Sequence, residues 1–303
     1  NTAFILASGN AHFAGINPKP YKDSQLDYDY KFLPLTLTQV YAGRIAQMCG
    51  ASGLVMTDAS ACASSLKVMN DVTYLIDHQG YDRVIVLGVE DTINDKVLNF
   101  FGESKACNTQ ETDYTGKKPS AFDKVNGGFY VGQGAVFAVF ESGRIAKSAH
   151  ARLLGAGMGS EVSTNAIGQR ADGQGFVRAA IQALRNAQLS PIDIGLIKTH
   201  GTGTASNNDA EKNAIMRMFD TPFQATSYKQ RIGHTMGASG LLETCLMIDD
   251  LKSGLIKGIP NRTNYDEFFL SQDNTCARKE QKILSLAAGM GNIYAAAIFD
   301  TAV

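Results

Sequence analysis

The sequence predicts an α/β fold, in which strands and helices alternate along the chain. Seven short apolar runs have the length of strands, and segments with helical periodicity separate several of them. The chain has 303 residues, 44% of them hydrophobic, which is enough to bury a sizeable core. These observations place the chain among the α/β proteins.

The apolar runs define the expected strands in chain order. The strands are expected at Ala3–Leu6, Leu54–Met56, Arg83–Val89, Ala135–Phe140, Ala151–Gly155, Gly195–Thr199 and Ile293–Phe299. Helical spacing of apolar residues predicts helices over Ser64–Ile76, Phe176–Gln188 and Leu241–Leu251. The stretch Phe101–Asn126, rich in Thr, Lys, Asp and Pro, is expected to be a long loop.

Composition excludes several classes of protein. The net charge is −1 and the isoelectric point is near 6.6, without the basic stripe expected of a nucleic-acid binder. No window approaches the ~18–20 apolar residues of a membrane span, and the first residues do not resemble a signal peptide. We therefore expect a cytoplasmic protein. Five widely spaced cysteines without a C-x-x-C pair argue against a disulfide framework and a zinc site.

Cys62 is the best candidate for a nucleophile. It follows the apolar run Leu54–Met56 and directly precedes the helical pattern that begins at Ser64. A helix start presents unpaired N–H groups and a positive dipole end, which favour a thiolate, and a strand-to-helix elbow exposes the side chain. The alternative is an inert cysteine that only packs in the core.

Two histidines follow strand-like runs on glycine-rich loops. His200 directly follows the run at Gly195–Thr199 and is followed by Gly-Thr-Gly-Thr204. Ligands of open α/β sheets bind at this end of a strand. His234 lies in Gly233-His-Thr-Met-Gly237, just before the third helical pattern, where an imidazole stays neutral and can donate a hydrogen bond. One cysteine and two such histidines form a chemical set.

These motifs together resemble those of the β-ketoacyl-acyl-carrier-protein synthases. Four segments carry the resemblance, in the family's order and with similar separations: Asp58-Ala-Ser-Ala-Cys62-Ala-Ser-Ser65, Gly128-Phe-Tyr-Val-Gly132-Gln-Gly134, His200-Gly-Thr-Gly-Thr204, and Lys229 with Gly233-His234 and Glu243. The resemblance implies the thiolase fold, a layered αβαβα arrangement of two pseudo-duplicated halves. It covers roughly Asn1 to Asn292.

The resemblance also implies roles for individual residues. Cys62 would take an acyl group from a carrier-protein thioester, and His200 and His234 would stabilise the enolate formed when a malonyl thioester loses carbon dioxide. Lys229 and Glu243 would orient these groups, unless they form an ordinary solvated pair. The site would need no cofactor of its own, because substrates arrive on the phosphopantetheine of an acyl carrier protein.

Further positions would contact the substrate. Thr202 and Thr204 match the threonines that contact the phosphopantetheine arm, although a hydroxyl in a turn can equally cap the backbone. The segment containing Met290 and Gly291 would supply an oxyanion-binding N–H and the gate to the acyl site. The family implies a homodimer or a heterodimer of ketosynthase type.

The chain departs from the family's pattern in several places. It begins on what resembles the family's second strand, so the N-terminal half is expected to lack its first strand and helices; the chain is either a fragment or a shortened relative. Met290 stands where the family has an aromatic gate residue. Gln133 and Asn208 stand where acidic residues are usual, with Asp209 a possible substitute for the second.

The charged stretch Glu141–Lys147 is the best place to divide the chain into halves of residues 1–144 and 145–303. The main functional prediction is a condensing enzyme that extends a fatty-acid, polyketide or polyene chain by two carbons. A non-catalytic partner subunit resembling a chain-length factor is the alternative. A degradative thiolase ranks last, since Gly289–Asn292 contains no second cysteine. The glycines of Gly155-Ala-Gly157-Met-Gly159 form only a partial dinucleotide motif.

Overall fold

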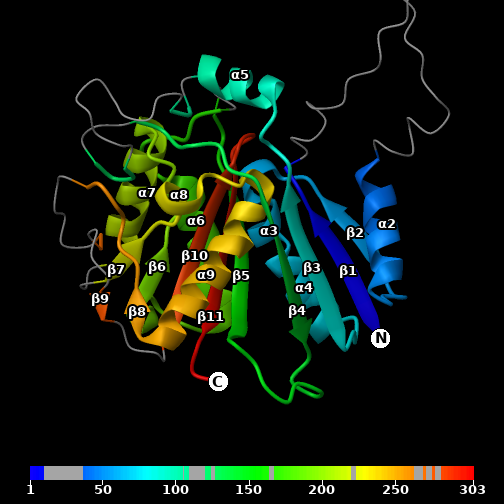
Figure 1. The fold of residues 1–303 in the computed structure, drawn as a ribbon. Coiled ribbons are helices and arrows are strands. Elements are labelled where there is room, and N and C mark those ends of the chain that lie inside the picture. Colours follow the sequence, from blue (N-terminus) through cyan, green and yellow to red (C-terminus); the bar gives the residue numbers. More distant parts are fainter. Residues whose placement is uncertain are drawn as a thin grey trace, which may run out of the picture.

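Two β-sheets, one from each half of the chain, form the frame of the protein (Figure 1). The computed structural model describes residues 1–9, 37–104, 106–108, 120–123, 127–163, 167–219, 223–262, 269–270, 275–276 and 281–303.

The N-terminal sheet has the order β2-β1-β3-β4. Its strands are β1 (Thr2–Ala7), β2 (Val55–Asp58), β3 (Arg83–Glu90) and β4 (Gly134–Glu141). Strand β1 runs parallel to β2 and β3, and β3 pairs antiparallel with β4. The parallel strands end on one edge, at which β2 leads into the segment of Cys62.

The C-terminal sheet has the order β5-β11-β10-β6-β7. Its strands are β5 (Arg152–Ser160), β6 (Leu196–Lys198), β7 (Gln224–Thr226), β10 (Lys282–Gly289) and β11 (Ile293–Asp300). A separate ribbon joins the two-residue strands β8 (Leu255–Ile256) and β9 (Thr275–Cys276).

The pairing pattern repeats between the two sheets. In the C-terminal sheet, β6 is parallel to β7 and β10, and β10 is antiparallel to β11. In the N-terminal sheet, β1 is likewise parallel to β2 and β3, and β3 is antiparallel to β4. Strand β5 pairs antiparallel with β11, and the described part of the N-terminal sheet has no counterpart of it. The expected duplication, with a smaller N-terminal half, is therefore confirmed.

Helices form three layers around and between the sheets (Figure 1). They are α2 (Thr38–Met48), α3 (Ser64–Lys67), α4 (Met69–Asp77), α5 (Asp95–Glu103), α6 (Gln174–Ala187), α7 (Ala205–Met218), α8 (Lys229–Ile232) and α9 (Ser239–Ser253). Helix α2 packs on the outer face of the N-terminal sheet, α3 and α9 lie between the sheets, and α6 and α7 cover the outer face of the C-terminal sheet. The result is the expected αβαβα layering.

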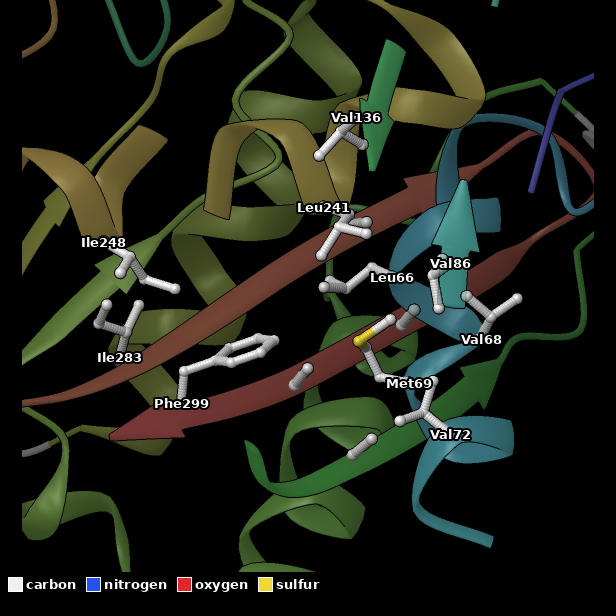
Figure 2. Packing of buried hydrophobic residues seen from close by; sticks show 14 of the residues in the cluster. Leu66, Val68, Met69, Val72, Val86, Val136, Leu241, Ile248, Ile283 and Phe299 are labelled. Atoms are coloured by element: carbon white, nitrogen blue, oxygen red, sulfur yellow. The ribbon is translucent and has the colours of Figure 1, made fainter. Parts of the chain in front are cut away.

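Alternation along β10 shows how one strand serves two cores. Ile283 and Ala287 face the layer between the sheets, whereas Leu284 and Leu286 face α6 and α7. Successive side chains of a strand point to opposite faces, so a strand buried on both sides is apolar throughout. Figure 2 shows the inner cluster, in which Leu66 and Met69 from α3 and α4 meet Leu241 of α9.

All seven expected strands are present, whereas β7, the two-residue strands β8 and β9, and the central strand β10 were not expected. The helix expected over Ser64–Ile76 changes geometry at Val68, which separates α3 from α4. The prediction of a loop over Phe101–Asn126 is wrong at its start, because Phe101–Glu103 forms the end of α5. Much of the remaining stretch lies outside the described residues.

The glycine run of β5 is explained by packing. A Cβ atom at Gly157 would lie 2.2 Å from the Ala179 carbonyl oxygen of α6, and one at Gly155 would lie 2.6 Å from the Ala187 nitrogen. The missing side chains let α6 approach the strand backbone closely. These glycines therefore need no nucleotide to account for them.

Of the helices that the structure describes, none combines the length and the apolar composition of a membrane span.

Candidate active site

Cys62 lies in a strained elbow between β2 and α3. It is the middle residue of a 3₁₀ turn over Ala61–Ala63, and Ala61 has a φ of +48°, which L-residues seldom adopt. Asp58 at the end of β2 accepts a hydrogen bond from the Ser60 N–H at 3.0 Å. The elbow thus turns the chain sharply and presents the sulfur beside a cavity.

The resting state of Cys62 differs from the expectation. The side chain is 9% exposed, and burial raises the pKa of its thiol to about 12, although the nearby Lys229 cation acts in the opposite direction. Desolvation outweighs the effect expected from the helix start. Burial therefore favours the protonated thiol of Cys62 near neutral pH.

We expect the alkylation of Cys62 by iodoacetamide to rise about tenfold per pH unit from pH 7 to pH 10, because only the thiolate reacts and the pKa is about 12. Peptide mapping by mass spectrometry separates Cys62 from the other cysteines. A rate that levels off below pH 9 would show that the helix start, and not burial, sets the ionisation of this thiol.

His200 lies two residues after Lys198, the last residue of β6. Its backbone N–H donates to Glu211 Oε1 at 2.5 Å, and the Gly201 N–H donates to Glu211 Oε2 at 2.9 Å. The imidazole is 3% exposed, and its Nδ1 has no hydrogen-bond partner among the described residues. Burial, followed by the positive charge of Lys229, holds the pKa of His200 well below 6.5. The ring is neutral at pH 7.

His234 is held from both sides of its backbone. Its N–H donates to the Tyr130 carbonyl at 2.7 Å, and its carbonyl accepts from the Gly132 N–H at 2.9 Å. The Nδ1 atom accepts a hydrogen bond from the Met236 N–H at 3.2 Å, so the proton of the neutral ring is on Nε2. Burial and then Lys229 hold the pKa of His234 well below 6.5. The neutral ring of His234 thus carries its N–H at Nε2.

Cys62 and the two histidines converge on one cavity. Its volume is about 440 Å³. The ring centroids of His200 and His234 are 5.5 Å apart, and Phe129 packs edge-to-face on His234 at 4.8 Å. The Cys62 sulfur lies 3.9 Å from the Met236 sulfur. The predicted residues that line the cavity are Cys62, His200, Thr202, Thr204, His234 and Met290.

Lys229 and Glu243 lie behind the histidines, away from solvent. Both side chains are 0% exposed, and Lys229 Nζ donates to Glu243 Oε1 at 2.7 Å. Burial opposes ionisation of Glu243, but Lys229 and Lys198 together hold its pKa below the ordinary value. The alternative of an ordinary solvated pair is therefore wrong.

The two threonines of the His200 loop face the cavity. Thr202 Oγ1 and Thr204 Oγ1 are 3.0 Å apart and share a hydrogen bond. Thr204 precedes α7, yet its side chain makes no capping hydrogen bond to the helix. Gly203 between them has a φ of +79°, and a Cβ there would lie 2.8 Å from the Gly128 carbonyl oxygen. The hydroxyls are thus available to a ligand.

The end of β10 meets the cysteine elbow. A Cβ at Gly289 would lie 2.6 Å from the Ser60 carbonyl oxygen, so only glycine lets these segments approach so closely. Met290 lines the cavity and packs with the cluster around Cys62 and Phe101. Gly291, expected to contact substrate, is exposed and does not line the cavity.

The departures at Gln133 and Asn208 have structural explanations. Gln133 Oε1 accepts from the Ile93 N–H at 3.4 Å, near the start of α5. Asn208 is buried, and its Oδ1 accepts from the Phe122 N–H at 3.1 Å, whereas Asp209 is exposed. An amide oxygen accepts this bond as a carboxylate does, and Asp209 does not take over the role.

Three buried charged residues at the site, Glu90, Lys198 and Glu211, were not predicted from the sequence. Glu211 anchors the His200 loop, and Lys198 shares the carboxylate of Glu243. Glu90 accepts from the Gly9 N–H at 2.5 Å and the Gly237 N–H at 3.0 Å, which ties the end of β1 to the His234 loop. A lysine inside the apolar run of β6 was the one available signal. Its partner, 45 residues away, could not be found from spacing.

Two family models match successive parts of this chain. The family model of the beta-ketoacyl synthase N-terminal domain matches residues 2–146. The family model of the beta-ketoacyl synthase C-terminal domain matches residues 150–263. The proposed division at residue 144 stays a prediction.

Named relatives are similar over most of this chain. The 3-oxoacyl-[acyl-carrier-protein] synthase 2 of Vibrio cholerae is 27% identical over 243 residues, which are 78% of this chain and 58% of the relative. A putative mitochondrial 3-oxoacyl-[acyl-carrier-protein] synthase of Schizosaccharomyces pombe is 28% identical over 281 residues, which are 87% of this chain and 65% of the relative. The chain thus spans less than two thirds of the length of these relatives.

Solved structures share the fold. One solved structure is a type II polyketide synthase acyl-carrier protein in complex with its ketosynthase. A chain of this complex superposes on the present chain with a TM-score of 0.88 at 19% identity, covering 99% of this chain and 78% of that chain. A beta-ketoacyl synthase from Burkholderia phymatum gives 0.84 at 22% identity, covering 99% and 75%. The fold is therefore the thiolase-like fold of the ketosynthases. Since both domain models match in succession and span most of its length, the chain belongs to the beta-ketoacyl synthase family.

Proposed function

We propose that this chain forms a condensing site, which extends an acyl group on Cys62 by two carbons taken from a malonyl group on an acyl carrier protein. The observation that carries the proposal is the convergence of Cys62, His200 and His234 on one cavity, with both imidazoles neutral. A thiol and two N–H donors suit acyl transfer followed by stabilisation of an enolate.

In the first step, the Cys62 sulfur attacks the carbonyl carbon of an acyl thioester. As the new S–C bond forms, the Cys62 thiol loses its proton to solvent. When the tetrahedral intermediate collapses, the bond between the acyl carbon and the carrier sulfur breaks, and the carrier thiolate takes up a proton and leaves as a thiol. Backbone N–H groups of the elbow and of the Gly289 segment are the proposed donors to the oxyanion. The close approach of Gly289 to Ser60 supports this pairing.

In the second step, a malonyl thioester loses carbon dioxide. The electron pair of the broken C–C bond moves to the thioester carbonyl and forms an enolate oxygen. Nε2–H of His234 is aimed by the Met236 N–H bond, and His200 supplies the second donor. The enolate carbon then attacks the acyl carbon on Cys62, the sulfur leaves as a thiolate and regains a proton, and a β-ketoacyl thioester remains on the carrier.

The proposed partner is an acyl carrier protein, and the proposed assembly is a homodimer or a ketosynthase-type heterodimer. The solved relatives include a ketosynthase in complex with an acyl-carrier protein and a ketosynthase/chain length factor pair. Thr202 and Thr204, with their hydroxyls at the cavity, suit contact with the amide groups of a phosphopantetheine arm. This arm belongs to the carrier, so the chain needs no cofactor of its own for this reaction.

Intact mass spectrometry after incubation with acyl-loaded carrier protein tests the proposal. We expect an increase by the mass of one acyl group, and complete loss of this adduct in Cys62→Ala. Cys107→Ala is the matched control, since Cys107 packs near the same cluster and plays no part in the reaction; its adduct should persist. A series of acyl lengths defines which chains the cavity accepts.

The absence of an adduct for every acyl length tested would overturn the proposal. That result would favour the non-catalytic partner subunit, whose role is to shape the acyl site of an associated synthase. Retention of the cysteine and both histidines around one cavity argues against this second candidate.

A further inference from the structure

Lys198 is a buried lysine that the proposed reaction does not use. It is the last residue of β6, two positions before His200, and its side chain is 0% exposed. A buried ammonium group carries a desolvation cost of several kcal/mol unless charges and hydrogen bonds offset it. Its contacts therefore indicate what keeps it in this position.

The ammonium group of Lys198 joins three elements. It donates to Glu243 Oε2 on α9 at 3.2 Å and to the Leu286 carbonyl of β10 at 2.9 Å. The backbone pairing of β6 with β10 extends to Lys198 and Ser285, one residue before Leu286. Strand β10 continues to Gly289 at the cavity. Lys198 thus connects β6, α9 and the part of β10 that leads to the site.

Four fully buried ions lie behind the histidines. Lys229 binds the other oxygen of Glu243 at 2.7 Å, and Glu211 holds the backbone N–H groups of His200 and Gly201. The charged groups that act on Lys198 are Glu243 of α9, Lys229 of α8 and Glu211 of α7. Burial raises the pKa of Glu211 and lowers the pKa of Lys198, and the opposite charges nearby act against both shifts. With all four groups ionised, two cations balance two anions. Without Lys198, this group of buried residues would carry a net charge of −1.

We propose that Lys198 is a positioning residue of the condensation site, which holds Glu243 and the end of β10 in place and keeps the buried ions behind His200 and His234 in balance. This inference rests on the proposed function where it concerns the reaction.

Loss of Lys198 has two physical consequences. An uncompensated negative charge behind the histidines favours imidazolium over imidazole, so both rings would take up a proton at higher pH. The same charge repels the enolate oxygen that forms in front of them. Burial of His200 and His234 acts against protonation in the native protein, and the positive charges of Lys229 and Lys198 add to that effect.

The test compares Lys198→Met with Lys198→Arg. Methionine retains the apolar stem and removes the charge, whereas arginine retains the charge. We expect Lys198→Met to slow decarboxylation of malonyl-carrier protein about 10- to 100-fold and to move the acid limb of its pH–rate profile up by about one unit. Lys198→Arg should restore the position of that limb. Lys252→Met, which removes an exposed lysine from α9, is the control and should change neither quantity.

NMR titration of the imidazoles of His200 and His234 needs no substrate. We expect both to titrate about one pH unit higher in Lys198→Met than in the parent. Unchanged titrations and an unshifted profile, with a rate that falls only as far as folding is lost, would overturn the inference. If the titrations shift while the parent protein neither accepts acyl groups nor decarboxylates malonyl thioesters, the proposed function fails and the charge-balancing role of Lys198 stands.

Discussion

Replacing His234 by alanine is expected to slow carbon–carbon bond formation about 10²–10³-fold, which is the usual effect of removing one donor to a developing oxyanion. The Nδ1 atom of His234 accepts from the Met236 N–H, so the donor is Nε2–H, and alanine has no group that replaces it. His200→Ala should produce an effect of the same order, because its ring lies across the cavity with centroids 5.5 Å apart.

The decisive measurement separates the two half-reactions. Both variants should still form the acyl adduct on Cys62 by intact mass, since neither imidazole is needed to carry the acyl group. Decarboxylation of malonyl-carrier protein, measured as release of labelled carbon dioxide, should slow to the same extent as condensation. Variants that lose the acyl adduct but still decarboxylate would place these histidines in the first half-reaction instead. His234→Gln, which retains an N–H donor, should recover part of the rate.

Replacing Glu243 by alanine is expected to reduce the free energy of unfolding by about 3–5 kcal/mol, because removal of one partner leaves a buried charge without compensation. Lys198 and Lys229 would lose the carboxylate that they share. Both side chains are fully buried, so water does not replace it. Ser239 Oγ, which also donates to Glu243 Oε1 at 2.5 Å, would lose its acceptor.

Urea unfolding followed by circular dichroism gives this free energy without any assay of activity. Glu141→Ala is a suitable control, since Glu141 pairs with Arg83 at the surface at 2.6 Å and its side chain is 29% exposed. Partly exposed pairs contribute about 0–1 kcal/mol. Equal losses in the two variants would contradict the assignment of a buried charge cluster. Glu243→Gln should lie between them, because its amide oxygen can accept from one lysine.

The sequence alone predicted the fold class, seven of the strands and six of the residues that line the cavity. The strands, Cys62, His200 and His234 were predicted from local signals: apolar runs bounded by polar residues, and side chains of known chemistry on turns after strands. Cys62, His200 and His234 are each recognisable in this way, because the elbow and the two loops are made from neighbouring residues. Thr202, Thr204 and Met290 came from the resemblance to a known family.

Only the tertiary structure decided the electrostatics of the site. The helix start beside Cys62 is a local feature and predicts a thiolate, whereas the burial that raises its pKa to about 12 arises from segments far away in sequence. Strand β10 was missed although β11, which is also covered on both faces, was predicted. Ser285 interrupts the apolar run of β10, and its buried contacts come from distant segments.

The partners of buried ions likewise could not be derived from spacing. Lys198 is 45 residues from Glu243 and 88 residues from Leu286, and the layers of the fold bring these positions into contact. Desolvation and ion pairing depend on what surrounds a group in three dimensions, whereas helix and strand formation depend mainly on sequence neighbours. The sequence therefore predicted which groups gather at the cavity, and the fold decided the protonation and the buried partners of these groups.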